Sequence, residues 1–183
     1  MSAIMIAEPA AEPVTLGETK DYLRVDDAES DAGLERLIAA ARTCVEGMTR
    51  RALIAQAWRY LTPAPKDNKI TVPGTPLRQV TAVRLFGPEG SVTTLDPQDY
   101  VVSMGAPATI HLRQGRSDAT GAEVDAEIGY GPAASDVPAD LRQAVLQLVA
   151  HWFERREPIT AGTFNQVPMT VTHTTAPYRV VGL

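Results

Sequence analysis

The sequence has a single cysteine among its 183 residues, so no disulfide can form within the chain. A reducing compartment fits this composition. No apolar run approaches the length of a membrane span. The opening residues, MSAIMIAEPAAEP, have no basic segment and only a short apolar patch, which does not fit a secretory signal. We therefore expect a cytosolic chain that does not contact a membrane.

Motifs that carry chemistry are also missing from the sequence. It contains no phosphate-binding glycine loop, nucleophile elbow, paired-cysteine site or zinc-protease helix. The three histidines are scattered, and His151 and Glu154, spaced i, i+3, lack a third metal ligand. Asp96, Asp99 and Asp125 fall at predicted turns, where aspartate caps backbone amides. We predict no catalytic residue, no cofactor and no metal site.

The negative charge is concentrated near the N-terminus. The chain has a net charge of −5, and residues 1–31 alone hold eight acids against Lys20 and Arg24. An acidic chain lacks the positive surface with which proteins grip phosphate backbones. A short helix, an acidic turn and a longer helix around residue 30 are spaced like a helix-turn-helix, but these acids oppose DNA reading.

Two helices are predicted in this N-terminal part. Thr15 and Glu18 have capping-box spacing and predict a short helix over residues 16–24. Ser30 is expected to cap a longer helix over residues 30–50, because apolar residues recur there at helical spacing. We expect the two helices to pack as a hairpin.

The middle of the chain has the pattern of a β-structure. Between residues 53 and 130, short β-branched or aromatic runs alternate with clusters of Pro, Gly and Asp. No helical pattern lies between the runs to supply crossover connections, so antiparallel pairing is favoured.

A last helix is predicted over residues 138–157, beginning at Pro138. Its apolar positions cover a wide arc, and such a helix usually touches more than one neighbour. One neighbour is the N-terminal helix pair, and the other is either the β-rich layer or another subunit. The charged end, Arg155, Arg156 and Glu157, either complements the helix dipole or forms ion pairs between subunits.

Both ends of the chain are expected to extend from this domain. Residues 1–13, rich in Ala, Pro and Glu, have little to bury and predict a flexible tail. Residues 158–183 hold six threonines and one charged residue, Arg179. Within them, residues 169–173 alternate like a strand. We expect an extended docking tail that becomes ordered against a partner, with disorder or simple packing as the alternative.

These patterns predict an α+β fold. It is a small helical bundle, made of the N-terminal helix pair and the C-terminal helix, with a β-rich antiparallel insertion between the helices. The domain covers residues 14–157, the β-rich part residues 53–130, and the tails flank it. Elements that pack well but carry no chemistry indicate an assembly component rather than an enzyme.

Several segments stand out by their order and spacing. They are VTLGETKDYLRVD, LIAAARTCVEGMTRRALI, WRYL, PGTPLRQVTAVRL, IGYG, DVPADLRQAVLQLVAHWFERRE and APYRV. In this order the chain resembles the head–tail connector proteins, also called adaptor or head-completion proteins, of tailed phages and gene transfer agents. The resemblance spans residues 14–180 and is most specific at residues 20–24, 137–142 and 177–180. None of these segments is a catalytic motif.

The resemblance implies a non-enzymatic structural protein at the head–tail interface of a virion or phage-like particle, made and assembled in the bacterial cytoplasm. It implies a homo-oligomeric ring of twelve copies under the portal protein, which extends the DNA channel and docks a stopper or tail-completion protein. Another virion assembly protein, such as tail completion, and a small cytosolic enzyme with an unrecognised site are the alternatives. The candidate residues for binding the portal or a neighbouring subunit are Arg155, Arg156, Glu157, Tyr178, Arg179 and Val180.

A DNA conduit should not bind its cargo tightly, and an acidic chain suits the transient, non-specific passage of double-stranded DNA. We therefore hypothesise that some acids among residues 18–31 face the channel. A merely solvated acidic face is the alternative.

Overall fold

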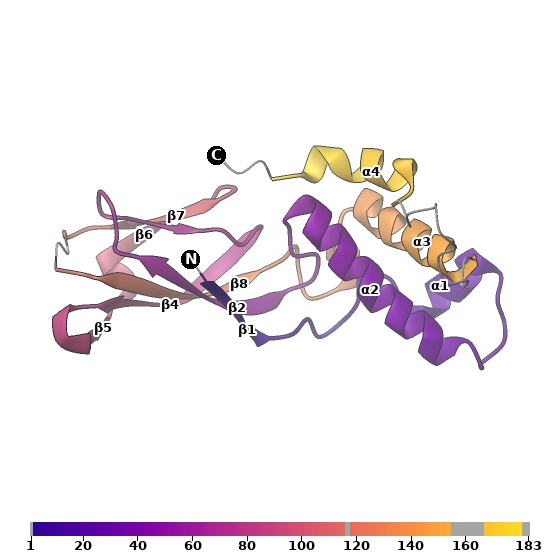
Figure 1. Ribbon diagram of the computed structural model, residues 1–183, viewed down its shortest axis with the longest axis horizontal. Coiled ribbons are helices and arrows are strands. Elements are labelled where there is room, and N and C mark those ends of the chain that lie inside the picture. The colour runs from indigo at the N-terminus through magenta and orange to yellow at the C-terminus, as the bar shows by residue number, and fades with distance from the viewer. Residues whose placement is uncertain (1, 116–117, 155–166, 181–183) are drawn as a thin grey trace, which may run out of the picture. The chain divides into compact units, whose positions relative to one another are not determined.

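The structure is a computed structural model that describes residues 2–115, 118–154 and 167–180. It divides into a β-rich unit, Met1–Ala10 with Ala55–Tyr130, and a helical unit, Ala11–Ile54 with Gly131–Leu183. The prediction of a mixed α and β chain with antiparallel sheets is confirmed (Figure 1). Among the described residues, none of the helices has the length and apolar character needed to cross a membrane.

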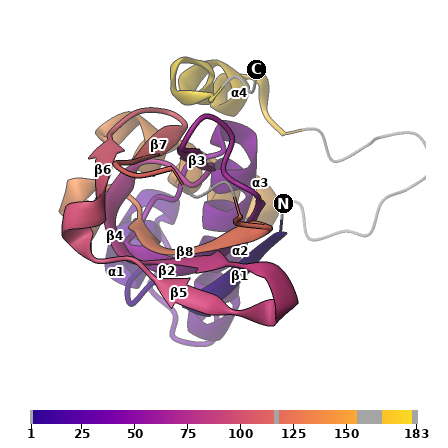
Figure 2. The same cartoon turned by 90° about the vertical axis from the view of Figure 1, so that its left-hand side faces the viewer.

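Two antiparallel sheets make the β-rich unit (Figure 2). The five-stranded sheet has the order β1-β2-β8-β4-β5, and the three-stranded sheet has the order β3-β7-β6. The strands are β1 (Ser2–Ala7), β2 (Gln56–Pro63), β3 (Lys69–Val72), β4 (Leu77–Phe86), β5 (Val92–Thr94), β6 (Tyr100–Ser103), β7 (Ala108–Leu112) and β8 (Gly121–Ile128).

The core of the β-rich unit follows from alternation along its strands. Successive side chains of a strand point to opposite faces, so every second residue enters the core. In β7 the buried residues are Ala108, Ile110 and Leu112. Tyr60 of β2 is also buried, stacks on Trp58 with ring centroids 6.4 Å apart, and has its pKa raised to about 12 by burial.

The prediction of a flexible tail over residues 1–13 is wrong for β1. This strand pairs antiparallel with β2, from Ser2 opposite Leu61 to Ala7 opposite Ala57. Composition indicated too little apolar surface for a packed element, but β1 is held through backbone pairing with β2. All six of its residues remain exposed.

The helical unit contains the three predicted helices: α1 (Leu16–Leu23), α2 (Asp31–Thr49) and α3 (Ala139–Glu154). Thr15 caps α1 as expected, since its Oγ1 accepts a hydrogen bond from the Glu18 amide at 3.1 Å. Ser30 makes no side-chain cap bond to α2. Instead, Asp27 Oδ1 accepts from the Ser30 amide at 2.8 Å.

The core of the helical unit is formed mainly between α2 and α3, which pack against each other. The apolar residues of both helices recur at helical spacing, so they line facing stripes. The wide apolar arc predicted for α3 is confirmed by its burial. The buried residues are Leu34, Ile38, Ala41 and Val45 of α2, and Leu141, Ala144, Val145, Leu146, Leu148 and Val149 of α3.

The prediction of an extended C-terminal tail is wrong for α4 (Met169–Thr175), which is a helix packed against α3 and α2. Val171 and Thr175 are buried, and i, i+4 spacing places them on one helical face. The alternation that indicated a strand is too short to outweigh this burial. A neighbour of α3 is therefore α4, which neither alternative for its second contact had named.

Candidate functional site

The predicted partner-binding residues Tyr178, Arg179 and Val180 follow α4 and contact the end of α2. The Val180 amide donates to the Thr49 carbonyl at 3.0 Å, and Arg179 Nε donates to the Met48 carbonyl at 3.3 Å. The last carbonyls of a helix have no partner within the helix, so outside donors satisfy them. The segment thus closes the C-terminal end of α2.

Tyr178 is held by two further residues of the helical unit. Arg51 Nε donates to the Tyr178 carbonyl at 2.6 Å, and the Tyr178 hydroxyl donates to Asp140 Oδ2 at 3.3 Å. Sequence reasoning missed Arg51 and Asp140, although both lie in segments that carry the family resemblance. Only folding brings Arg51 to Tyr178, which is 127 positions away. Tyr178 and Val180 are half-buried, and Arg179 is exposed.

Arg155, Arg156 and Glu157 lie outside the described residues. Their assignment to a contact with the portal or a neighbouring subunit stays a prediction. The structure describes three of the six candidates, Tyr178, Arg179 and Val180.

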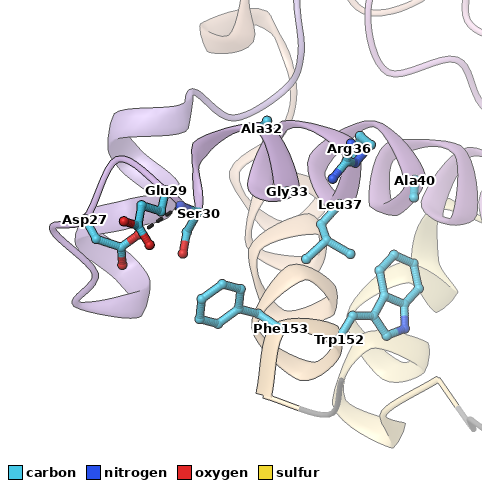
Figure 3. Close-up of a pocket in the computed structure, with 10 residues that line it drawn as sticks. All are labelled: Asp27, Glu29, Ser30, Ala32, Gly33, Arg36, Leu37, Ala40, Trp152 and Phe153. Atoms are coloured by element: carbon cyan, nitrogen blue, oxygen red, sulfur yellow. Dashed lines mark hydrogen bonds between the residues drawn. The ribbon is translucent and has the colours of Figure 1, made fainter. Parts of the chain in front are cut away.

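A groove of about 950 Å³ lies between the start of α2 and the end of α3 (Figure 3). Leu37 of α2 points between Trp152 and Phe153 of α3 (Figure 3). These side chains form an apolar floor, and both aromatic residues are only partly buried. The remaining lining residues are Asp27, Glu29, Ser30, Ala32, Gly33, Arg36 and Ala40.

The charges of the groove lie beside its apolar floor. Asp27 and Glu29 contribute acids and Arg36 contributes a base. Hydrogen bonds from Ser30 lower the pKa of Asp27, so this residue is ionised at neutral pH. Partly exposed aromatic residues such as Trp152 and Phe153 can anchor a contact with another protein.

The acidic N-terminal segment separates into paired and exposed acids. Glu18 accepts from Arg142 Nη2 at 2.5 Å, and Asp31 pairs with Lys20 Nζ at 2.7 Å. These bridges fasten α1 to α3 and α2. The exposed acids of residues 18–31 are Asp21, Asp26, Asp27 and Glu29.

Asp125 does not lie at a turn, so that prediction is wrong. It lies within β8 and accepts from Arg59 Nε at 2.7 Å and Arg84 Nη1 at 2.8 Å. The hydrogen bond from Arg59 is the largest influence that lowers the pKa of Asp125. Asp96 and Asp99, by contrast, form a capping box around a 3-10 turn, as predicted.

Metal-binding side chains do not gather in the described part of the chain. Within residues 2–115, 118–154 and 167–180, no three His, Cys, Asp or Glu side chains are placed to hold a metal ion. Cys44 is partly buried on α2, and burial raises the pKa of its thiol, which lowers the thiolate fraction.

Comparison with known proteins assigns the family. The family model described as "Head completion protein" matches residues 13–181. The chain belongs to the head completion protein family. The resemblance seen in the sequence is confirmed, and the family model covers both α1 and the Tyr178–Val180 segment. No curated protein matches the chain.

Solved structures similar to the chain come from gene transfer agent (GTA) particles. One is the neck of an empty GTA particle computed with C6 symmetry, with 26% identity, a TM-score of 0.81, and coverage of 100% of this chain and 97% of that chain. The virion of a native GTA particle gives the same values. The neck of a native GTA particle computed with C12 symmetry has 27% identity, a TM-score of 0.74 and the same coverage.

Proposed function

We propose that the chain is a structural head–tail connector of a gene transfer agent or a similar phage-like particle, located in the neck between head and tail. The observation that carries this proposal is the likeness, over 100% of this chain, to chains of GTA necks, together with the family match. The same architecture throughout the chain favours the same structural role.

The proposed assembly is a ring of twelve copies beneath the portal protein. Its support is a similar chain in a neck computed with C12 symmetry. The ring extends the DNA channel and docks a stopper or tail-completion protein. A closed ring of identical subunits uses one repeated interface between two different surfaces of each copy.

The role is non-enzymatic. The family match and the likeness to chains of GTA necks support this reading. The groove between α2 and α3 offers an apolar floor to an anchoring side chain of another protein.

The contact with the portal or a neighbouring subunit is assigned to the C-terminal part of the chain. Arg155, Arg156 and Glu157 are the first part of this contact, and Tyr178, Arg179 and Val180 are the second. Arg179 is the best placed of the latter, because it is exposed and its bond to the Met48 carbonyl is long, at 3.3 Å. A carboxylate of the partner would form a stronger, charge-assisted bond.

The exposed acids Asp21, Asp26, Asp27 and Glu29 are candidates for the channel wall. Negative side chains repel phosphates and keep DNA from adhering. Glu18 and Asp31 are weaker candidates, because basic side chains of the same unit already neutralise them.

Electron microscopy of the particles, with subunit counting by quantitative mass spectrometry, tests this function. We expect the chain between the portal and the tail, in the number of copies of a ring. Absence from the neck, or far fewer copies than a ring requires, would contradict the proposal.

A pair of matched variants tests the C-terminal contact. Arg179→Ala should reduce the joining of this protein to heads, whereas Arg113→Ala, at an exposed arginine of the β-rich unit, should not. Equal joining by both variants would exclude Arg179 from the contact.

A further inference from the structure

The outer edge of β1 is an open edge of the five-stranded sheet. β1 stands first in the strand order and pairs with β2 on one side. No described strand pairs with its other side. Every second backbone amide and carbonyl along that side points away from the sheet, ready to bond to another strand.

The composition of β1 offers no protection for this edge. Its sequence, SAIMIA, has neither charge nor proline, and all six residues are exposed. Ile4, Met5 and Ile6 are 54%, 40% and 51% exposed. Proteins usually blunt an open edge with charges, proline, short strands or bulges. Here only one irregularity, between Met5 and Ala7, interrupts the pairing with β2.

The opposite edge of the same sheet is mostly protected. Along β4, two register shifts interrupt the ladder, and the exposed Arg78 and Gln79 both bond to Glu127. Beyond them only β5 remains, a strand of three exposed and uncharged residues, Val92–Thr94. Among the described strands, the sheet thus has one unprotected edge at β1 and a short open edge at β5.

This inference rests on the proposed ring. Copies related by rotation must join through two different surfaces. The edges of one sheet satisfy this requirement, since β1 and β5 lie at its two ends. We propose that the outer edge of β1 pairs with β5 of a second copy, so that neighbouring copies share a seam between their five-stranded sheets. This strand addition uses backbone hydrogen bonds and covers Ile4 and Ile6.

The size of the seam predicts weak association outside the ring. Three residues of β5 span about 10 Å of strand. Such a contact buries far less than the roughly 1,200 Å² of a stable interface. The isolated chain should therefore stay largely monomeric, and the seam should close when other neck proteins hold the copies together.

Disulfide trapping tests the seam in assembled particles. In a Cys44→Ala background, Ile4→Cys is combined in turn with Val92→Cys, Thr93→Cys or Thr94→Cys. Three strands separate β1 from β5 in one copy, which places them about 19 Å apart. A disulfide needs Cα atoms within about 7 Å, so only bonds between copies can form.

We expect at least one pair to give a ladder of cross-linked multimers on a non-reducing gel. Each single-cysteine variant serves as control and should give none. A dimer from Ile4→Cys alone would indicate that β1 pairs with β1, which overturns the seam. No ladder from any pair, with the ring present in normal copy number, overturns the seam and leaves the connector function intact.

A charge variant provides a second test that does not need oxidation. Ile4→Lys should reduce incorporation into necks roughly tenfold, because a charged lysine on an open edge strand opposes the addition of another strand. Val101→Lys is the matched control: Val101 is 46% exposed on β6 of the other sheet and should not matter. Circular dichroism verifies that both variants fold. Normal incorporation of Ile4→Lys would overturn the proposal.

Discussion

Arginines of the two units fasten different kinds of structure, although both units contain arginine–carboxylate pairs. In the β-rich unit, Arg59 and Arg84 pair with carboxylates of the neighbouring strand β8. In the helical unit, Arg51 and Arg142 reach backbone carbonyls of Tyr178 and Pro13, more than 120 positions away. The arginines of the sheet strengthen a ladder that backbone pairing already forms. Those of the helices fasten segments that have no ladder.

This difference indicates where each unit is vulnerable. Loss of a sheet arginine leaves the strands paired, so the cost is limited to the ion pairs. Loss of a helical arginine loosens the segment that it fastens, although the apolar anchor of that segment still holds. Four substitutions test this comparison, in order of decreasing expected effect.

Val171→Ala should have the largest effect. Val171 is the fully buried apolar anchor of α4, and its truncation removes two methyl groups and leaves a cavity. We expect a loss of about 2 kcal/mol in the free energy of unfolding, measured by urea denaturation. Thr172→Ala, at the next and exposed position, is the control and should change stability by no more than about 0.5 kcal/mol. Similar effects of both would show that α4 is not anchored through Val171.

Asp125→Asn should cost roughly 1–2 kcal/mol, because Arg59 and Arg84 lose a charged acceptor but remain partly in water. The pKa of Asp125 is lowered in the folded chain. Its stabilising contribution is therefore complete above the ordinary value of about 3.9 and is lost as the pH falls further. As the pH falls below about 4, the variant should lose less stability than the wild type. An unchanged acid dependence would contradict this role.

Arg51→Ala should cost about 1 kcal/mol through its bond to the Tyr178 carbonyl. The local effect is more telling. Hydrogen exchange at the Val180 amide, which donates to the Thr49 carbonyl, should accelerate because the segment opens more often. Arg36→Ala, at an exposed arginine of α2, should leave this exchange rate unchanged. If Arg36→Ala accelerates this exchange as well, the fastening role assigned to Arg51 is wrong.

Glu46→Gln should have the smallest effect at neutral pH, about 0.5 kcal/mol or less. Glu46 accepts from the Leu53 amide at 2.8 Å and from Arg42, yet burial raises its pKa. The folded chain holds this proton more tightly than the unfolded chain, so the contribution of Glu46 falls as pH rises through the raised pKa from about 4.3. That decline should be absent in the variant, the reverse of the Asp125 case. Urea denaturation at a series of pH values measures it.

Much of the helical unit was predictable because its signals are local. The Thr15 cap and the helical spacing of apolar residues located α1, α2 and α3 within a few positions. The groove beside Trp152 and Phe153 was not predictable, because it forms between the start of one helix and the end of another. The fastening roles of Arg51 and Asp140 were not predictable either, because their shared partner Tyr178 lies far from both in the chain.

The two wrong predictions at the ends share one cause. β1 and α4 are each too short to form alone, so their sequences were interpreted as tails. β1 exists because β2 supplies backbone partners, and α4 exists because α2 and α3 bury Val171. Asp125 was misplaced for a related reason, since only strand pairing brings Arg59 and Arg84 beside it.

The sequence by itself determined the mixed α and β class, the three helices α1, α2 and α3, the antiparallel pairing and the family, because periodicity, capping and segment order are properties of the chain. Only the tertiary structure decided that both ends are ordered elements, that Tyr178–Val180 closes the end of α2, and that β1 leaves an unprotected edge. These features depend on hydrogen bonds and burial between residues far apart in the chain, and such contacts exist only after folding.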